Sequence, residues 1–270
     1  MKLFELRKSL KEEFNQLNID VVDVDFIISE VLQVSRTELA LIEDIDENAY
    51  TTIMECVEKR KNNVPVDKIF KRSYFYGLEF KINNFVLAPR QDSELLVETA
   101  IKYIKENNFK TALDLCTGSG CLAISVKKNT EVEMTASDVS SRALSVAKQN
   151  AQKHNVEIEF IKSNMFELIN KKFDIIITNP PYIATDEIAE LEKEVTENDP
   201  HIALDGGELG MRFYNIIHDN LRKTLNDHGV IVMEIGEGQK VLIESLFNDF
   251  NLIETVYDYN NIERVLVFRK

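Results

Sequence analysis

The fold is decided by the stretch Ala112-Leu113-Asp114-Leu115-Cys116-Thr117-Gly118-Ser119-Gly120, where a short apolar run passes into a glycine-containing loop. The run 112–115 predicts a buried strand, and a helix is expected to begin at about Cys121. Gly118 and Gly120 have no Cβ, so their backbone can turn tightly and approach a ligand closely. In a doubly wound sheet, ligands bind outside the carboxyl ends of the strands, which is where this loop lies.

Short apolar runs alternate with helical stretches from position 111 to the end of the chain. This alternation predicts a mostly parallel sheet that helices cover on both faces. The last two strands are joined by the turn 258–263, which is too short for a crossover helix, so we expect them to be antiparallel. The resulting sheet resembles that of S-adenosylmethionine-dependent methyltransferases. The predicted strands are 112–115, 133–137, 157–162, 174–178, 230–235, 252–257 and 264–268, with helices between them such as 142–154 and 211–226.

The first 68 residues have the periodicity of helices. An apolar stripe at three- and four-residue intervals predicts a first amphipathic helix. This stripe consists of Leu3, Leu6, Leu10, Phe14 and Leu17. Further helices are expected after Asp20, after the capping box Ser35-Arg36-Thr37-Glu38 and after Asp46. The segment holds no catalytic constellation, so it predicts a small helical bundle that binds a partner or simply packs.

Between the helical segment and the sheet, the period changes to that of strands. Asn tolerates positive φ, so Asn83-Asn84 predicts the turn of a hairpin between 80–82 and 85–87. We therefore expect a helical domain at 1–68, a β-hairpin linker at 69–88 and an α/β domain at 89–270.

The charge balance bears on the kind of partner. The chain has 270 residues, with 32 Lys and Arg against 46 Asp and Glu, a net charge of −14. Residues 1–85 carry 12 basic and 16 acidic side chains, and residues 86–270 carry 20 and 30. Both segments are therefore acidic, which disfavours nonspecific binding of a nucleic-acid backbone.

Features missing from the sequence lead us to expect a cytosolic protein without a metal site. No apolar run approaches the roughly 18 residues of a membrane span, and acids occupy the start, where a signal peptide would be basic. Three cysteines without CxxC spacing, Cys56, Cys116 and Cys121, fit a reducing cytosol. The four histidines show no ligand spacing, so no metal site is expected.

The strands after the glycine loop supply candidate cofactor contacts. Asp138 ends the second strand, 18 residues beyond Gly120, where an acid can accept hydrogen bonds from ribose hydroxyls. Its alternative role is that of a helix N-cap. The first glycine of GxGxxG is absent, so an adenosyl cofactor without a pyrophosphate fits better than a dinucleotide. After the third strand, Asn164 can pair with an adenine edge and Met165 can pack on the ring, although Asn164 is equally a turn residue.

The tetrapeptide Asn179-Pro180-Pro181-Tyr182 directly follows the predicted strand 174–178. The two prolines fix φ and remove two donors, which leaves a stiff segment whose carbonyls stay available. The Asn179 side-chain oxygen and the Pro180 carbonyl can accept from one planar NH₂ group, on which the Tyr182 ring can stack. This predicts methyl transfer to a conjugated nitrogen, either an amide or an exocyclic base amine. An isolated Asn-Pro-Pro would more often be a turn.

These residues together resemble the protein-glutamine N5-methyltransferases that modify the Gly-Gly-Gln motif of peptide-chain release factors. The resemblance covers nearly the whole chain and includes the helical N-terminal domain. It is carried by Val86-Leu87-Ala88-Pro89-Arg90, the loop 114–120, Asp138, Asn179-Pro180-Pro181-Tyr182, Asp199-Pro200-His201-Ile202-Ala203-Leu204-Asp205-Gly206-Gly207, Glu234-Ile235-Gly236 with Gln239, and Arg264. The tetrapeptide alone is shared with nucleic-acid methyltransferases.

The resemblance implies a seven-stranded, Rossmann-like class I methyltransferase sheet of the α/β class, with a small N-terminal helical bundle and a β-hairpin linker. It implies transfer from S-adenosylmethionine to the Gln side-chain amide, with Asn179, Pro180 and Tyr182 as catalytic residues and Pro181 as a further substrate contact. It assigns the helical domain to gripping the release factor. The implied cofactor residues are Cys116, Thr117, Gly118, Ser119, Gly120, Asp138, Asn164, Met165 and Asn179.

The chain departs from the family pattern near the cofactor. Cys116 stands where Gly is usual, which is harmless if its φ is negative. Asn164 replaces Asp, and Met165 replaces an aromatic residue. Gln91 replaces Pro and Asp92-Ser93 replaces Glu-Thr, which puts Arg90 and Ser93 in doubt as cofactor contacts. We expect activity to survive with altered cofactor affinity, because the tetrapeptide is intact.

Two other functions compete with this hypothesis. One is a nucleic-acid methyltransferase acting on adenine N6 or guanine N2, which would need base extrusion and a basic groove. The other is a cofactor-binding interaction protein without catalysis, which the intact Asn179–Tyr182 segment disfavours. We expect a cytoplasmic, monomeric enzyme whose partner is a release factor, with no direct contact to nucleic acid or membrane.

Overall fold

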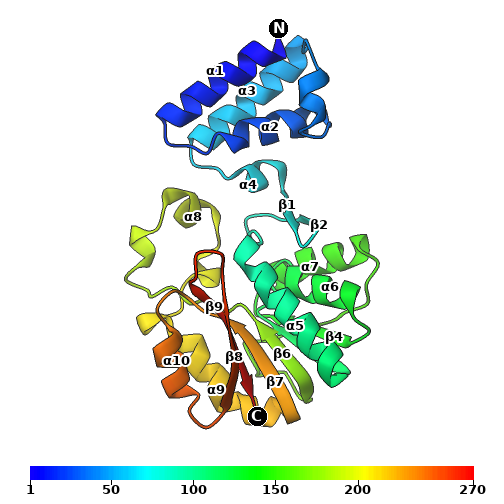
Figure 1. Cartoon of the computed structure of the whole chain (residues 1–270), viewed down its shortest axis with the longest axis vertical. Coiled ribbons are helices and arrows are strands. Elements are labelled where there is room, and N and C mark those ends of the chain that lie inside the picture. The colour runs from blue at the N-terminus through cyan, green and yellow to red at the C-terminus, as the bar shows by residue number, and fades with distance from the viewer. The chain divides into compact units, whose positions relative to one another are not determined.

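The computed structural model describes residues 1–270. Seven of its strands form one sheet, in the order β5-β4-β3-β6-β7-β9-β8 (Figure 1). β3 to β7 are parallel, and β9 runs antiparallel to both β7 and β8. The predicted α/β sheet with an antiparallel end is therefore confirmed. Its strands are β3 (Thr111–Leu115), β4 (Glu133–Asp138), β5 (Glu159–Lys162), β6 (Phe173–Thr178), β7 (Leu225–Glu234), β8 (Asn251–Tyr257) and β9 (Glu263–Arg269).

The two faces of the sheet bury separate clusters because alternate side chains of each strand point to opposite sides. Ala112, Ile175 and Val232 pack with α5 (Glu94–Asn107) and α6 (Cys121–Asn129). On the other face, Leu113, Ile176 and Met233 pack with α9 (Arg212–Thr224) and α10 (Lys240–Leu246). α7 (Ser141–Lys153) contacts β4 and β5, on the same side as α5 and α6 in Figure 1.

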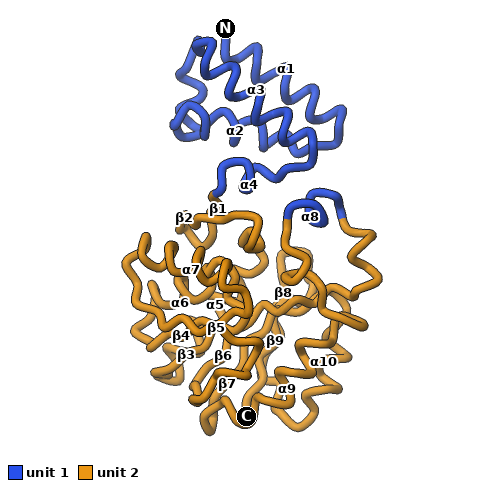
Figure 2. Tube along the Cα trace, turned by 180° about the vertical axis from the view of Figure 1, so that it is seen from behind, with its two compact units in different colours: residues 1–71, 192–198 blue, residues 72–191, 199–270 orange.

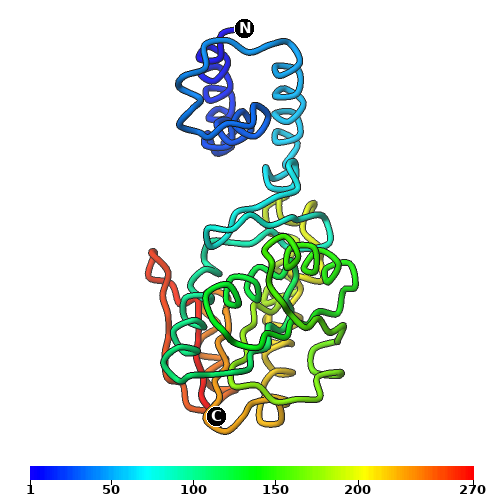
Figure 3. The backbone as a smooth tube through the Cα atoms, turned by 90° about the vertical axis from the view of Figure 1, so that its right-hand side faces the viewer, coloured from blue at the N-terminus to red at the C-terminus, as the bar shows by residue number.

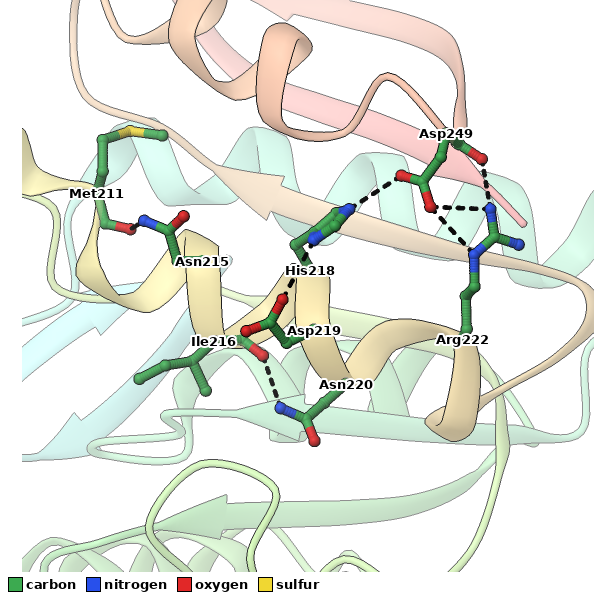
Figure 4. A network of polar contacts seen from close by, with 8 residues as sticks. All are labelled: Met211, Asn215, Ile216, His218, Asp219, Asn220, Arg222 and Asp249. Carbon is green, nitrogen blue, oxygen red and sulfur yellow. Dashed lines mark hydrogen bonds and ion pairs between the residues drawn. The ribbon is translucent and has the colours of Figure 1, made fainter.

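A polar network on the surface joins α9 to the turn between α10 and β8 (Figure 4). His218 Nε2 lies 2.9 Å from Asp249 Oδ1, and Arg222 Nη2 donates to both Asp249 Oδ2 and the Asp249 carbonyl. This network ties α9 to the turn that follows α10, the two helices that cover this face of the sheet. The turn between β8 and β9 projects from the sheet (Figure 3), and Asp258 closes it by accepting from the backbone N–H groups of Asn260 and Ile262.

The contacts divide the chain into two units, residues 1–71 with 192–198, and residues 72–191 with 199–270 (Figure 2). The first unit contains α1 (Leu3–Gln16), α2 (Val22–Leu32), η1 (Glu38–Leu41), α3 (Glu47–Lys61), α4 (Val66–Phe70) and α8 (Lys193–Asn198). α8, distant in sequence, belongs to this unit because Arg60 binds both Asp23, at 2.6 Å, and Glu194, at 2.8 Å. Asn198 also donates to the Asn63 carbonyl.

The helical signals of the first 68 residues give mostly the expected structure. The stripe from Leu3 to Phe14 is buried, whereas Leu17 lies at the exposed end of α1. Asp46 caps α3 by accepting from Ala49 N. The Ser35 capping box forms, but it begins only the four-residue 3₁₀ turn η1 rather than a full helix. None of the helices combines the length and apolar composition that a membrane span requires.

The hairpin exists, but its predicted turn was wrong. β1 (Arg72–Phe75) and β2 (Leu78–Lys81) pair antiparallel around Tyr76-Gly77, whose φ values of 50° and 70° suit a tight two-residue turn. Asn83 instead forms a local turn in which its Oδ1 accepts from Phe85 N, and no strand follows at 85–87. Short 3₁₀ turns complete the second unit at η2 (Gln91–Ser93), η3 (Ile188–Glu190), η4 (His201–Ala203) and η5 (Glu208–Gly210).

Candidate functional site

The glycine loop and the Asn-Pro-Pro-Tyr segment start side by side at one edge of the sheet. Along the chain, the strands run outward from β3 through β4 to β5 and then return to β6, on the other side of β3. Leu115, the last residue of β3, pairs with Thr178, the last of β6, and Thr178 Oγ1 donates to the Leu115 carbonyl at 2.8 Å. Such a switch point is where open α/β sheets bind ligands.

Asp114 organises the glycine loop from beneath. Its side chain is fully buried, and Oδ2 accepts from Thr117 Oγ1 at 2.5 Å and from Ala123 N at 3.1 Å. Burial raises the pKa of Asp114 to about 7, although these two hydrogen bonds favour the ionised form. Gly120 has φ +81°, and an added Cβ would lie 3.1 Å from Ala147 Cβ, so this position lets the loop pack against α7.

Asp138 ties the end of β4 to the same loop. Its Oδ2 accepts from Gly118 N at 2.9 Å, and its Oδ1 accepts from Ser140 N at 2.8 Å. The N-cap of α7 is Ser140, whose Oγ accepts from Ala143 N. The alternative role of Asp138 as this N-cap is therefore wrong, and its carboxylate lies beside the glycine loop. Burial raises its pKa.

Cys116 and Met165 meet beside the loop in left-handed backbone conformations. Their φ values are 65° and 48°, and Cys116 Sγ lies 3.7 Å from Met165 Sδ. A negative φ, the condition under which a cysteine at 116 would be harmless, is not met: the loop keeps a geometry that favours glycine, so Cys116 carries backbone strain. Asn164 is exposed, and its Nδ2 donates to Glu167 Oε1 at 2.6 Å. Burial raises the pKa of the Cys116 thiol, which makes it a packing group rather than a nucleophile.

Asn179 and Tyr182 converge on Ser93, which the sequence left in doubt as a cofactor contact, and on Glu234, which had no role assigned from the sequence. Asn179 Nδ2 donates to Ser93 Oγ at 3.2 Å, and Ser93 Oγ donates to Glu234 Oε2 at 2.6 Å. The Tyr182 hydroxyl lies 3.5 Å from Glu234 Oε1. Glu234 ends β7, the neighbour of β6, so its position at a strand's carboxyl end was the available signal.

Glu234 is a buried carboxyl group on which the charges of Arg264 and Asp92 act from nearby. Burial raises its pKa to about 7, while the Ser93 hydroxyl and the charge of Arg264 favour ionisation and the charge of Asp92 opposes it. The Tyr214 hydroxyl donates to its backbone carbonyl at 2.9 Å. Glu234 is therefore held at both backbone and side chain beneath the tetrapeptide.

Gln239 fixes the far end of the tetrapeptide. Its Nε2 donates to the Tyr182 carbonyl at 2.8 Å, while its Oε1 accepts from Gly236 N at 2.9 Å. Gly210 lies so close that a Cβ there would stand 2.0 Å from the Tyr182 oxygen. The backbone of the segment is thus confined from two directions.

The residues at and beneath the glycine loop have unpaired polar atoms and open backbone, which fit an adenosyl ligand that carries polar groups of its own. The buried atoms Asp114 Oδ1, Ser119 Oγ and Ser137 Oγ have no hydrogen-bond partner within the chain. A Cβ at Gly118 would meet nothing within 4 Å, so the backbone there is open to close approach. No group of three or more His, Cys, Asp or Glu side chains could hold a metal ion.

A sheet of this order, with a glycine loop after β3, an acid at the end of β4 and Asn-Pro-Pro-Tyr after β6, defines a class I methyltransferase. The family model "Methyltransferase small domain" matches residues 91–243, and "PrmC N-terminal domain" matches residues 5–70. The fold is shared with the ribosomal protein L11 methylase of Lactobacillus delbrueckii subsp. bulgaricus, with a TM-score of 0.52 at 20% identity over 68% of this chain and 82% of that chain.

Curated relatives identify the family within this class. The release factor glutamine methyltransferase of Thermodesulfovibrio yellowstonii is 35% identical over 97% of this chain and 96% of its own length. That of Clostridium acetobutylicum is 35% identical over 99% and 95%. The chain belongs to the release factor glutamine methyltransferase family, and it is a methyltransferase enzyme.

Proposed function

We propose that this enzyme transfers a methyl group from S-adenosylmethionine to the side-chain amide nitrogen of the glutamine in the Gly-Gly-Gln motif of release factors. The observation that supports the proposal is the pairing of Leu115 with Thr178, because the glycine loop that follows Leu115 and the segment Asn179–Tyr182 that follows Thr178 leave the sheet as neighbours. Family membership supports the choice of a protein glutamine over a nucleic-acid base.

The tetrapeptide would hold the glutamine amide for attack. Asn179 Oδ1 and the Pro180 carbonyl would each accept one N–H of the amide, and the Tyr182 ring would stack on its plane. Fixing a weak nucleophile in a reactive geometry removes much of the entropic barrier. The two hydrogen-bond acceptors also draw the N–H hydrogens toward themselves, which shifts electron density onto the nitrogen and makes its lone pair more available. The overall reaction yields N5-methylglutamine, S-adenosylhomocysteine and one proton.

The residues around the glycine loop would hold the cofactor, which supplies an electrophilic sulfonium methyl group when bound. Asp138 would accept from the ribose hydroxyls, since each oxygen keeps a further acceptor site beyond its backbone hydrogen bond. The loop from Cys116 to Gly120 would contact the aminoacyl portion through its backbone. Met165 and Asn164 would contact the adenine, after Asn164 exchanges its hydrogen bond with Glu167.

The helical segment 1–68 would bind the release factor away from the glutamine, with 69–88 as the hairpin linker and 89–270 as the catalytic domain. A short Gly-Gly-Gln loop carries little binding energy of its own, so remote docking supplies the affinity. The net charge of −14 supports a folded protein partner rather than nucleic acid. We propose that the enzyme is cytoplasmic and acts as a monomer.

A labelling experiment tests the proposal. The enzyme is incubated with labelled S-adenosylmethionine and, in separate reactions, with release factor, with release factor whose motif Gln is changed to Ala, and with duplex DNA. We expect label only in unmodified release factor. Label in DNA, or undiminished label in the Gln→Ala protein, would contradict the proposed substrate.

An Asn179→Ala variant tests the assignment of the site. It should abolish transfer while leaving cofactor affinity near that of the unmodified enzyme, because Asn179 is proposed to act mainly on the glutamine amide. Equal losses of transfer and cofactor binding would make Asn179 a cofactor or folding residue instead.

A further inference from the structure

The amide of Asn179 can be oriented in two ways, and only one suits a substrate that donates hydrogen bonds. Side-chain amides carry an acceptor oxygen on one side and a donor NH₂ group on the other. The proposed substrate presents an NH₂ group, so the Asn179 oxygen must face it. Which way the amide points is decided by the groups behind it.

Behind Asn179 stands a chain of hydrogen bonds with a fixed direction. An ionised Glu234 carboxylate can only accept, so the Ser93 hydroxyl must give it its single hydrogen, across 2.6 Å. Ser93 Oγ then has only lone pairs left for Asn179, and the NH₂ group of Asn179 turns toward it, 3.2 Å away. The Asn179 oxygen is consequently left for the substrate.

Three separate elements bring these residues together. Ser93 ends η2, Asn179 follows β6 and Glu234 ends β7. Both Ser93 and Glu234 are buried, with 3% exposure each, so water does not compete for their hydrogen bonds. The other carboxylate oxygen of Glu234, Oε1, lies 3.5 Å from the Tyr182 hydroxyl, and the charges of Asp92 and Arg264 also act on this carboxylate.

We infer that Ser93 and Glu234 are positioning residues that lock the Asn179 amide with its oxygen toward the substrate, so that the site takes a primary amide and rejects a carboxylate. The inference rests on the proposed function, since it concerns the same glutamine. Its specific consequence is discrimination between Gln and Glu at the methylated position, because a carboxylate has no hydrogen to give the Asn179 oxygen or the Pro180 carbonyl.

The test uses Ser93→Ala, with Ser93→Thr as the conservative variant that keeps the hydroxyl. Glu234→Gln is the second probe, because the new amide can donate to Ser93 Oγ and so reverse the direction of the hydrogen bonds from Glu234 through Ser93 to Asn179. Ser125→Ala is the matched control: this serine is equally buried, on α6, and its Oγ has no hydrogen-bond partner. Assays run in mildly alkaline buffer, where Glu234 is ionised. The measurements are kcat, KM for release factor, cofactor Kd, and inhibition by release factor carrying Gln→Glu.

We expect Ser93→Ala and Glu234→Gln to lower kcat between about 10-fold and about 100-fold, the usual cost of a misoriented reacting group. Cofactor Kd should not change, and Ser93→Thr and Ser125→Ala should keep the original kcat. The Gln→Glu release factor should inhibit the Ser93→Ala enzyme more strongly than the unmodified one, because the freed Asn179 amide can turn its NH₂ group toward a carboxylate.

The inference is overturned if Ser93→Ala and Glu234→Gln keep their kcat, if Ser93→Thr fails to rescue, or if cofactor Kd rises as much as kcat falls. Unaltered inhibition by the Gln→Glu protein would also overturn it. Failure of the proposed function would look different: the unmodified enzyme would not label release factor at all, or Asn179→Ala would retain transfer.

Discussion

Replacing Gly210 by alanine should damage this fold more than the same change at Gly238. Both glycines have positive φ, +68° and +76°, so a side chain at either costs about 1–2 kcal/mol in backbone conformation. At Gly238 the added Cβ meets nothing within 4 Å. At Gly210 it would stand 2.0 Å from the Tyr182 oxygen and 2.4 Å from Gln239 Nε2, so the hydrogen bond between those two atoms must break.

The extra cost of Gly210→Ala can be worked out from that bond. Leaving the carbonyl and the amide without partners costs about 1–3 kcal/mol beyond the conformational term. For a chain of this size that difference corresponds to roughly 2–10 °C in Tm. Gly210→Ala should also lower kcat, because the moved carbonyl belongs to Tyr182, whereas Gly238→Ala should not.

Thermal unfolding of both variants measures this difference. The chain has no Trp, so circular dichroism is the suitable probe. If the two variants melt together, or if Gly238→Ala melts first, the close packing of Gly210 on the tetrapeptide is refuted.

Three further predictions follow from the site. Cys116→Gly should raise the free energy of unfolding by no more than about 1 kcal/mol, because relief of the strained positive φ outweighs the added flexibility of glycine. Clear destabilisation in urea unfolding would show that the contact between Cys116 Sγ and Met165 Sδ matters more. The pKa of Asp114 is raised to about 7 in the folded chain, so its contribution to stability is fully present below about pH 4 and is lost as pH rises from there to about 7. Asp114→Asn should therefore stabilise the chain above pH 7 by on the order of 2–4 kcal/mol relative to the unmodified protein. An unchanged pH profile of unfolding would count against this prediction. Gln239→Glu keeps the acceptor for Gly236 N but loses the donor to the Tyr182 carbonyl, so kcat should fall about 10-fold with cofactor Kd unchanged. An unchanged kcat in steady-state kinetics would show that catalysis does not depend on this hydrogen bond to the Tyr182 carbonyl.

Sequence periodicity predicted the sheet well because its strands are buried on both faces. Runs such as 174–178 and 230–235 are rich in β-branched residues, and the helices between them left few possible connections. The short turn at 258–263 was enough to predict the antiparallel end. Strand lengths were less accurate, since β7 begins at Leu225, in a polar stretch that periodicity alone did not mark.

The hairpin turn was misplaced because two turn signals compete within a few residues. Asn83-Asn84 has the better local propensity, but the structure turns at Tyr76-Gly77. The position of β2 is set from far away, by Asn150 on α7, whose amide binds both the N–H and the carbonyl of Lys81. No local pattern contains that contact.

The candidate site was predictable where it follows strands and unpredictable where it depends on tertiary contacts. The glycine loop and Asn179–Tyr182 come directly after strands and Asp138 ends one, so parallel pairing gathers them at one edge of the sheet. Ser93 and Glu234 are 141 residues apart, and their hydrogen bond exists only once the sheet has formed. The left-handed φ of Cys116 was also hidden, because a loop that needs glycine geometry can tolerate a cysteine at a cost in strain.

The membership of α8 in the helical unit has a consequence for dissection of the protein. The chain leaves the second unit after residue 191 and re-enters it at 199, so the helical unit is discontinuous in sequence. A fragment ending at residue 71 would lack the acidic partner that Glu194 provides for Arg60, leaving that guanidinium with Asp23 alone. Conversely, a fragment starting at residue 72 would carry an orphaned α8 between the tetrapeptide and Asp199. A clean separation of the two units therefore has to cut the chain three times, after residues 71, 191 and 198.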